Sequence, residues 1–433
     1  MGSLETFFIF KFMKKIIALI FCIAIADQAL STGLPKYHKK GRMASKSFNL
    51  TLDSYIGTKH RIIIRNVQVG NLDKRYNFIL DTGSGTYISE SLANDLKLNI
   101  VHTESVTDGY SYEKVNYGLT NIGIQGVEFE DIITGVMTED IGSGVVCDID
   151  GIIGNNIMRF CVWQFIDGKV TITDDTNNLT IKDYYDQKLT YSSRYFLPFV
   201  EAGLGGQFRT DSFIDLGSNS FFTLSSYECS LIPNKKVLKG KGHFISTLNI
   251  ADTHSDESDV TIAEVPEFNF GNAGKKWGKF SYENKTQIVQ NVHIDVEDAK
   301  YLSFKTIGSE ILDFYSIIID YPKKRFYSRI IEDYNQPSFR SFGFSVKPDE
   351  NSGFEIAVVW DNSSASLKGL KPGSKLIQIN QLNLEKLLET HPACEIYESI
   401  KHEIMSNEKV LILIQNDSNN IEKFELEKSN LLD

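Results

Sequence analysis

Several features are scarce in this sequence of 433 residues, whose length predicts roughly three domains. Proline occurs 9 times, and 45 basic residues face 56 acidic ones, which gives a formal net charge of −11. A protein that binds nucleic acid through its phosphates needs a basic surface, so the charge argues against that class and against a nucleic-acid partner. The 42% hydrophobic and 23% charged shares are those of a globular protein and exclude a disordered or fibrous chain.

Cysteine is also scarce, with 5 residues, too few for a disulfide scaffold in a chain of this length. Four of them follow the amino-terminal apolar segment: Cys147, Cys161, Cys229 and Cys394. None forms a CxxC pair and no histidine stands at metal-ligand spacing, so we expect no metal and no cofactor. Cys147 and Cys161 either pair, if the protein is exported, or stay buried as small apolar thiols.

Long hydrophobic runs are missing as well. Two lysines precede an apolar run, Ile16–Ala26, which is too short to span a bilayer and ends in a small-x-small site. This order is typical of a secretory signal. We predict a signal peptide over residues 1–26, a basic linker over residues 27–44, and export to the periplasm, cell envelope or exterior of a bacterium. The alternative is an uncleaved membrane anchor.

Aromatic residues, in contrast, are plentiful, with 28 phenylalanines and 19 tyrosines, which favours β-structure. From Ser45 the chain shows short alternating strands, such as Phe48–Leu52, bounded by turn residues every 8–12 positions. Long amphipathic helices are rare before the last hundred residues. We therefore predict a mainly β protein.

The chain also repeats itself once. Phe78–Ser89 returns as Ser212–Thr223, and each copy is an apolar strand, Asp-x-Gly-Ser and a second apolar strand. Gly151–Phe160 returns as Lys305–Phe314, and each copy carries Ile-Gly. The same order of motifs in both halves predicts two lobes of one architecture. These lobes are expected to cover residues 45–190 and 191–335.

Asp81 and Asp215 open the two Asp-x-Gly-Ser copies, and each would project a carboxylate from a tight turn that glycine permits. Two facing carboxylates cannot both ionise, so they share one proton. The ionised member can take a proton from a water, and the protonated member can donate to a peptide carbonyl. We expect hydrolysis without a metal or a covalent intermediate. The supporting loop residues are Thr82, Gly83, Ser84, Leu216, Gly217 and Ser218.

At these residues the chain resembles the pepsin/retropepsin clan of aspartic proteases. Phe78–Gly85 matches the motif that carries the catalytic aspartate, and Ile152–Gly154 and Thr306–Gly308 match the hydrophobic-hydrophobic-Gly segment that passes beneath it. The sequence of these motifs resembles bacterial retropepsin-like proteins more than pepsin. The resemblance implies a bilobal acid-protease fold, aspartic-type endopeptidase activity with Asp81 and Asp215 as the dyad, a polypeptide substrate in the interlobe cleft, and a monomer.

The resemblance also implies roles for neighbouring side chains. Thr82 would join a hydrogen-bond network between the lobes, and Ser84 would bond to Asp81. Leu216 stands where the family expects Thr or Ser, so one side of that network lacks its hydroxyl. The site is therefore either an active, asymmetric dyad or that of a pseudoprotease that holds peptides without cutting them.

In the family a β-hairpin flap closes over the cleft. Thr107–Tyr112 is the candidate flap, and its expected tip is Asp108, Gly109 and Tyr110. The alternative is an ordinary exposed hairpin.

Residues 338–430 predict a different, small α+β module. It contains a strand at Phe354–Val359, a Gly-Leu-x-Pro-Gly stretch within Asn362–Ser374, and a helix near Cys394–Met405. This module resembles a PDZ domain of the bacterial envelope type. The resemblance implies binding of a peptide end as an added strand. Backbone amides near Phe342, Gly343 and Phe344 would take the terminal carboxylate. The alternative is an unrelated α+β domain.

Overall fold

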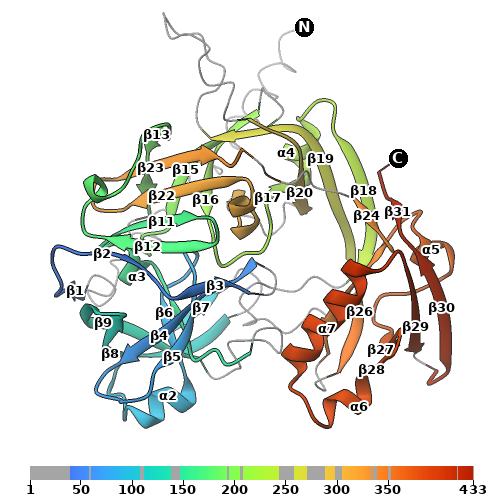
Figure 1. Ribbon diagram of the computed structural model, residues 1–433, viewed down its shortest axis with the longest axis horizontal. Coiled ribbons are helices and arrows are strands. Elements are labelled where there is room, and N and C mark those ends of the chain that lie inside the picture. Colours follow the sequence, from blue (N-terminus) through green and yellow to red (C-terminus); the bar gives the residue numbers. More distant parts are fainter. Residues whose placement is uncertain are drawn as a thin grey trace, which may run out of the picture. The chain divides into compact units, whose positions relative to one another are not determined.

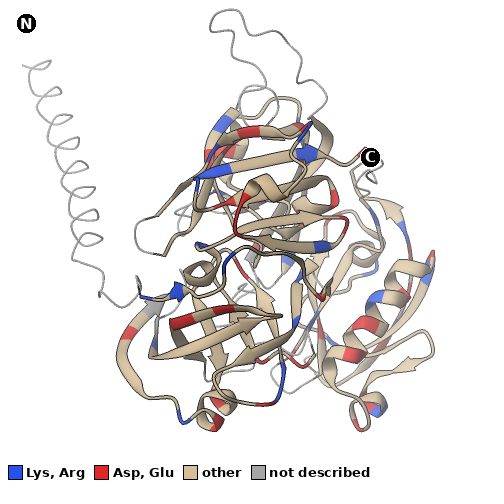
Figure 2. Cartoon of the chain, turned by 60° about the vertical axis from the view of Figure 1, so that its left-hand side comes forward, with Lys and Arg blue, Asp and Glu red and all other residues tan. Residues whose placement is uncertain are grey.

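The computed structural model confirms a mainly β chain (Figure 1). It describes residues 40–57, 60–107, 112–137, 147–192, 195–204, 208–242, 258–270, 288–297, 305–332, 334, 339–349, 353–416 and 418–432. The predicted signal peptide and most of the predicted linker lie outside these residues. None of the helices within them is long and apolar enough to cross a membrane. Acidic and basic residues are interspersed along the chain in the view of Figure 2.

The first Asp-x-Gly-Ser loop belongs to a sheet of the amino-terminal half. Its strands are β1 (Arg42–Met43), β3 (Ser54–Ile56), β4 (Ile62–Val69), β5 (Tyr76–Leu80), β6 (Thr86–Ser89), β7 (Ile100–Thr107), β8 (Tyr112–Ile124), β9 (Val127–Met137) and β10 (Gly151–Ile153). Helices α2 (Glu90–Asp95) and α3 (Asn155–Met158) accompany it. The Ser89 hydroxyl caps α2 by accepting the Leu92 N–H at 3.2 Å, which fixes where β6 ends.

The second Asp-x-Gly-Ser loop belongs to another sheet, which is built from the second repeat. Its strands are β14 (Thr190–Tyr191), β15 (Pro198–Leu204), β16 (Phe208–Ile214), β17 (Phe222–Ser225), β18 (Lys236–Gly242), β19 (Ser258–Phe270), β20 (Val289–Glu297) and β21 (Lys305–Ile307), with α4 (Ser226–Ser230) and the 3₁₀ helix η4 (Ser309–Asp313). β21 runs parallel to β16 and antiparallel to β17. β10 lies in the same way between β5 and β6. The repeated sequence therefore forms the same local arrangement twice.

A further sheet takes strands from both repeats. It consists of β2 (Asn49–Thr51), β11 (Val162–Ile166), β12 (Lys169–Thr173), β13 (Tyr185–Lys188), β22 (Tyr315–Asp320) and β23 (Arg325–Ile330), and the 3₁₀ helix η2 (Thr176–Asn178) follows β12. β11 pairs with β22, with Trp163 opposite Ile319, so this sheet joins the two halves. Asp167 and Gly168 both have positive φ (49° and 70°) at the two-residue turn between β11 and β12.

The carboxyl-terminal module has a hydrophobic core of its own. Its elements are β24 (Arg340–Ser341), β25 (Phe344–Pro348), β26 (Phe354–Trp360), α5 (Ser364–Leu367), β27 (Lys375–Ile379), β28 (Leu382–Asn383), α6 (Leu384–Leu388), α7 (Ala393–Ser406), β29 (Lys409–Gln415), β30 (Ile421–Glu427) and β31 (Ser429–Asn430). β26 also pairs with β18, so the sheet of the second half continues into the module. A Cβ on Gly240 or Gly242 would lie 2.6 or 2.5 Å from a carbonyl oxygen of β26, so these glycines permit the close pairing.

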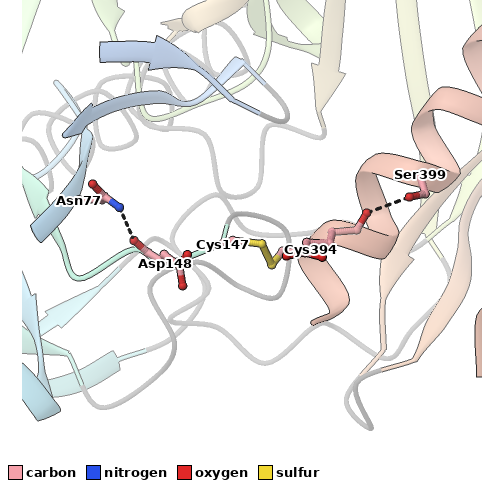
Figure 3. Close-up of a disulfide and its surroundings, with 6 residues drawn as sticks. Asn77, Cys147, Asp148, Cys394 and Ser399 are labelled. Atoms are coloured by element: carbon pink, nitrogen blue, oxygen red, sulfur yellow. Dashed lines mark hydrogen bonds between the residues drawn. A yellow bond between two sulfur atoms is a disulfide. The ribbon is translucent and has the colours of Figure 1, made fainter. Parts of the chain in front are cut away.

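A disulfide joins Cys147 to Cys394, at a Cα–Cα distance of 5.5 Å (Figure 3). Cys147 follows β9, where the Asn77 side chain donates to the Asp148 carbonyl at 3.2 Å, and Cys394 lies in the first turn of α7. The alternative of a Cys147–Cys161 pair is wrong, because Cys161 is buried in the main core beside Met43. The disulfide therefore ties the module to the first half.

This connectivity predicts the outcome of peptide mapping. Digestion without reductant is expected to yield one linked pair, containing Cys147 and Cys394, while Cys161 and Cys229 react with an alkylating reagent only after unfolding. Because the bond closes a loop of 247 residues, reducing it is expected to lower the free energy of unfolding by about 5 kcal/mol. A linked Cys147–Cys161 pair would contradict the assignment.

The β18–β26 pairing predicts a second effect. Gly240→Ala and Gly242→Ala should each destabilise the protein by about 1–3 kcal/mol, because the added methyl group meets the backbone of β26. Lys241→Ala is the matched control, since Lys241 is exposed between the two glycines. Urea unfolding measures the three variants, and an equal loss for all three would refute the role of the glycines.

Candidate active site

Each Asp-x-Gly-Ser loop is anchored by the Ile-Gly segment of its own repeat. The Asp81 N–H donates to the Ile153 carbonyl at 3.0 Å, and the Asp215 N–H donates to the Ile307 carbonyl at 2.8 Å. Both aspartates directly follow strands with buried side chains, β5 and β16. The carboxyl groups therefore project from two short, firmly held loops.

The structure brings the two predicted aspartates together. A Cβ on Gly83 would lie 2.4 Å from Asp215 Oδ1, and a Cβ on Gly217 would lie 2.2 Å from Asp81 Oδ1. Any side chain at either glycine would thus displace the carboxyl group of the other repeat. Asp81 and Asp215 hydrogen-bond to each other through their side chains. Asp81 is only 4% exposed, and Asp215 is partly exposed.

Backbone amides hold both carboxyl groups. Asp81 Oδ1 accepts the Gly83 N–H at 2.6 Å. Asp215 Oδ1 accepts the N–H groups of Gly217 at 3.1 Å and Ser218 at 3.2 Å. Burial, followed by the charge and the hydrogen bond of Asp81, raises the pKa of Asp215 well above its ordinary value, although Arg61 and the Gly217 N–H act in the opposite direction. The pair therefore retains a proton at a pH where an isolated aspartate is ionised.

Thr82 links the two loops, while Leu216 cannot. The Thr82 hydroxyl donates to the Ile214 carbonyl at 2.8 Å and accepts the Leu216 N–H at 2.7 Å. Leu216 is fully buried in the hydrophobic core. The second loop thus offers only backbone groups, and the hydroxyl network is one-sided, as the sequence indicated.

Of the two loop serines, Ser84 differs from the expectation. The Ser84 hydroxyl donates to the Gly85 carbonyl at 2.8 Å. The bond expected from Ser84 to Asp81 is not found among the described residues, because the hydroxyl is held by its own loop. Ser218 bonds to the Ser220 hydroxyl at 3.1 Å, and its carbonyl accepts the Ser309 hydroxyl at 2.8 Å. Both serines therefore stiffen their loops.

Three buried residues beneath the first loop were missed by the sequence reasoning. The Tyr321 hydroxyl donates to the Asn155 side chain, whose amide in turn donates to the Thr82 carbonyl. Asn156 Oδ1 accepts the Thr86 N–H at 2.9 Å and its hydroxyl at 2.6 Å. The Asn-Asn pair directly after the first Ile-Gly was the available signal, because two adjacent amides in a buried segment need partners.

Arg61, which precedes β4, was also missed. Burial lowers the pKa of its guanidinium, while the charges of Asp81 and Asp215 raise it. Nothing in a single arginine beside an apolar strand distinguishes it from a surface residue, so no sequence signal identified it. The site therefore contains two carboxyl groups and a cation.

The structure describes only part of the predicted flap. β7 and β8 form an antiparallel hairpin up to Thr107 opposite Tyr112, but the predicted tip, Asp108, Gly109 and Tyr110, lies outside the described residues. At the base of the hairpin, the Tyr117 and Tyr87 hydroxyls are 3.2 Å apart. Burial is the main cause that raises the pKa of Tyr87 to about 12.

The residues predicted to bind a peptide end are buried or hydrogen-bonded within the carboxyl-terminal module itself. Phe342 is fully buried, and the Gly343 N–H donates to the Ser341 hydroxyl at 3.1 Å. The Tyr397 hydroxyl on α7 donates to the Val346 carbonyl of β25 at 3.3 Å. A peptide added alongside β25 would have to displace this bond.

Metal ligands are not gathered at this site. Within the described part of the chain, no group of three or more His, Cys, Asp or Glu side chains could hold a metal ion.

The Thr82 bonds predict a stability effect. Thr82→Val removes the partner of two buried backbone groups and is expected to lower the free energy of unfolding by about 2 kcal/mol. Thr82→Ser keeps the hydroxyl and should lose less than about 1 kcal/mol. Guanidinium unfolding at constant pH compares the two variants, and a loss for Thr82→Ser as large as that for Thr82→Val would contradict the dominant role of the hydroxyl.

Comparison with known proteins finds similar chains among the solved structures, but none among family models or curated proteins. No family model matches the chain, and no curated protein matches it. Conglutin gamma, a basic 7S globulin from lupine seeds, is 9% identical, covers 66% of this chain and 95% of its own, and has a TM-score of 0.40. Basic 7S globulin from soybean is 10% identical, covers 65% and 94%, and has a TM-score of 0.39. Similarity at this level carries no argument about function.

These comparisons overturn the family predicted from the sequence. No family model and no curated protein supports the pepsin/retropepsin clan or a PDZ domain. The physical reason lies in the motifs, because Asp-x-Gly-Ser and Gly-Leu-x-Pro-Gly are short turns that meet local backbone requirements and can occur on many folds. The comparisons thus assign the chain to no family, and any function must be argued from the site itself.

Proposed function

We propose that this chain is an exported aspartic-type endopeptidase whose dyad is Asp81 and Asp215. The observation that carries the proposal is that two carboxyl groups from equivalent loops each pack against the glycine of the other loop. The two-lobed organisation with a small α+β module belongs to this proposal, as do a polypeptide substrate and a monomeric state. Docking of a peptide end at β25 is part of it only if Tyr397 moves.

The proposed reaction needs one proton on the pair. The ionised carboxylate takes a proton from a water, and the resulting hydroxide attacks the carbonyl carbon while the other carboxyl group donates its proton to the carbonyl oxygen. Collapse of the tetrahedral intermediate breaks the C–N bond, and the leaving nitrogen takes the proton that came from the water. The raised pKa of Asp215 supports one retained proton on the pair, which either carboxyl group can donate first.

The disulfide supports the exported part of the proposal. A bond such as Cys147–Cys394 persists in oxidising compartments and is rare in the cytosol.

A second candidate is a protein that binds peptides without cutting them. Leu216 favours it, because only one side of the dyad has a hydroxyl between the loops. The carboxyl contact is nevertheless intact, so we favour the peptidase.

The test compares cleavage by four proteins. The full chain, Asp81→Asn, Asp215→Asn and the control Asp211→Asn are incubated with a mixed peptide library from about pH 3 to about pH 8. The wild type and the control should cleave with a bell-shaped pH profile, because Asp211 is exposed on β16. Each dyad variant should lose at least about 10³-fold in kcat/KM, because it can no longer share one proton between two carboxylates.

The outcomes separate the candidates. Equal cleavage by all four proteins would refute the dyad. Peptide binding by all four without cleavage would favour the non-cutting candidate. Loss of activity in Asp81→Asn alone would make the second loop a passive partner or require a dimer of first loops.

A further inference from the structure

Arg61 directly precedes β4, and Asp81 directly follows β5. β4 pairs antiparallel with β5, with Ile63 opposite Ile79, so Arg61 and Asp81 each lie two residues from this pair at the same end of the two strands. Residues opposite each other in such a pair present their side chains on the same face. Ile63, Ile79 and Ile152 pack together on that face, and Tyr87 packs against them. Arg61 and Asp81 thus follow this cluster at the same end of the two strands.

The chain before β4 also meets the second repeat. The Gly57 N–H donates to the Arg61 carbonyl at 2.7 Å, which closes the turn between β3 and β4. Next to Arg61, His60 lies 3.7 Å from the carboxylate of Asp313 at the end of η4. The turn that carries Arg61 therefore lies against both repeats. The guanidinium interacts electrostatically with Asp215 as well as with Asp81.

Two tyrosines of the described residues also interact with the dyad. Tyr87 on β6 and Tyr321 after β22 both sense the charge of Asp81, and burial, the larger cause, raises the pKa of each. Both are therefore neutral in the range where carboxyl groups titrate. His60 and Asp313 form a pair of their own. Arg61, in contrast, carries a positive charge that interacts with both aspartates.

We propose that Arg61 is a positioning residue for the dyad, whose permanent charge neutralises the singly ionised carboxyl pair and sets the pH range in which that pair exists. A buried pair with one proton carries a charge of −1, which is costly without a partner. The guanidinium offsets that charge, since arginine stays protonated in proteins. It also stabilises the doubly ionised, inactive pair, so it moves both ionisations to lower pH. The inference rests on the proposed peptidase function.

The first test is the pH profile of cleavage. Arg61→Gln removes a cation that lowers the pKa of Asp215, so both limbs of the profile should move to higher pH, by about one unit or more. Arg61→Lys keeps the charge and should shift the limbs by less than about half of that. Arg65→Gln is the matched control, because it removes the same charge from an exposed position on β4, beside Asp53. An unshifted Arg61→Gln profile would overturn the proposal.

A second readout does not depend on activity. The stability cost of Arg61→Gln is measured by urea unfolding across pH, in the wild-type dyad and in the Asp81→Asn/Asp215→Asn background. With the wild-type dyad, the loss of stability caused by Arg61→Gln should grow as pH rises. The carboxyl pair then ionises without the guanidinium that offsets its charge. In the neutral background the cost should be smaller and independent of pH. The same pH-independent cost in both backgrounds would mean a merely structural arginine and would overturn the proposal.

Failure of the peptidase proposal and failure of the Arg61 proposal give different results. A wild type that cleaves nothing refutes the peptidase, while the unfolding experiment still decides the role of Arg61. If Arg61→Gln fails to fold, the neutral-dyad background should restore folding. Failure of that combined variant to fold would overturn the proposal.

Discussion

Two carboxyl groups in contact impose the constraint on which the rest of this structure depends. Asp81 and Asp215 cannot both ionise at low cost at this distance, and each carboxyl group occupies the space where the glycine of the other loop would otherwise carry a Cβ. The rest of the fold must therefore hold together two loops from distant parts of the chain. At their closest points these loops carry glycine and no side chain. Backbone amides that point at both carboxylates satisfy part of this requirement.

The fold meets the constraint by using one arrangement twice and then modifying it. In each repeat a short Ile-Gly strand lies between the two strands that flank the loop and anchors the aspartate. Beneath the first loop, Thr82, Asn155 and Tyr321 form a hydrogen-bonded chain that reaches from one repeat into the other. The second loop has Leu216 in the core instead. The two carboxyl groups thus lie in different environments, which suits different roles for them in one reaction.

Sequence patterns predicted the mainly β class, the paired Asp-x-Gly-Ser loops and the one-sided network at Leu216, because these depend on local periodicity and on glycine within tight turns. They did not predict Arg61, Asn155 or Tyr321, whose roles arise from register and from contacts between distant segments. The Cys147–Cys394 bond was missed for the same reason, since its partners are 247 residues apart. The family was wrongly predicted because short turn motifs do not specify the fold around them.

The most direct test of the account is an atomic-resolution crystal structure of the protein near pH 5, in which the carboxyl C–O bond lengths of Asp81 and Asp215 are refined without restraints. The account predicts an oxygen–oxygen contact of about 2.5–3.0 Å between the two side chains, with unequal C–O bonds in one carboxyl group and equal bonds in the other. Such a result would place a single proton on the pair. A separation beyond about 6 Å, or two carboxylates with equal bonds, would contradict it.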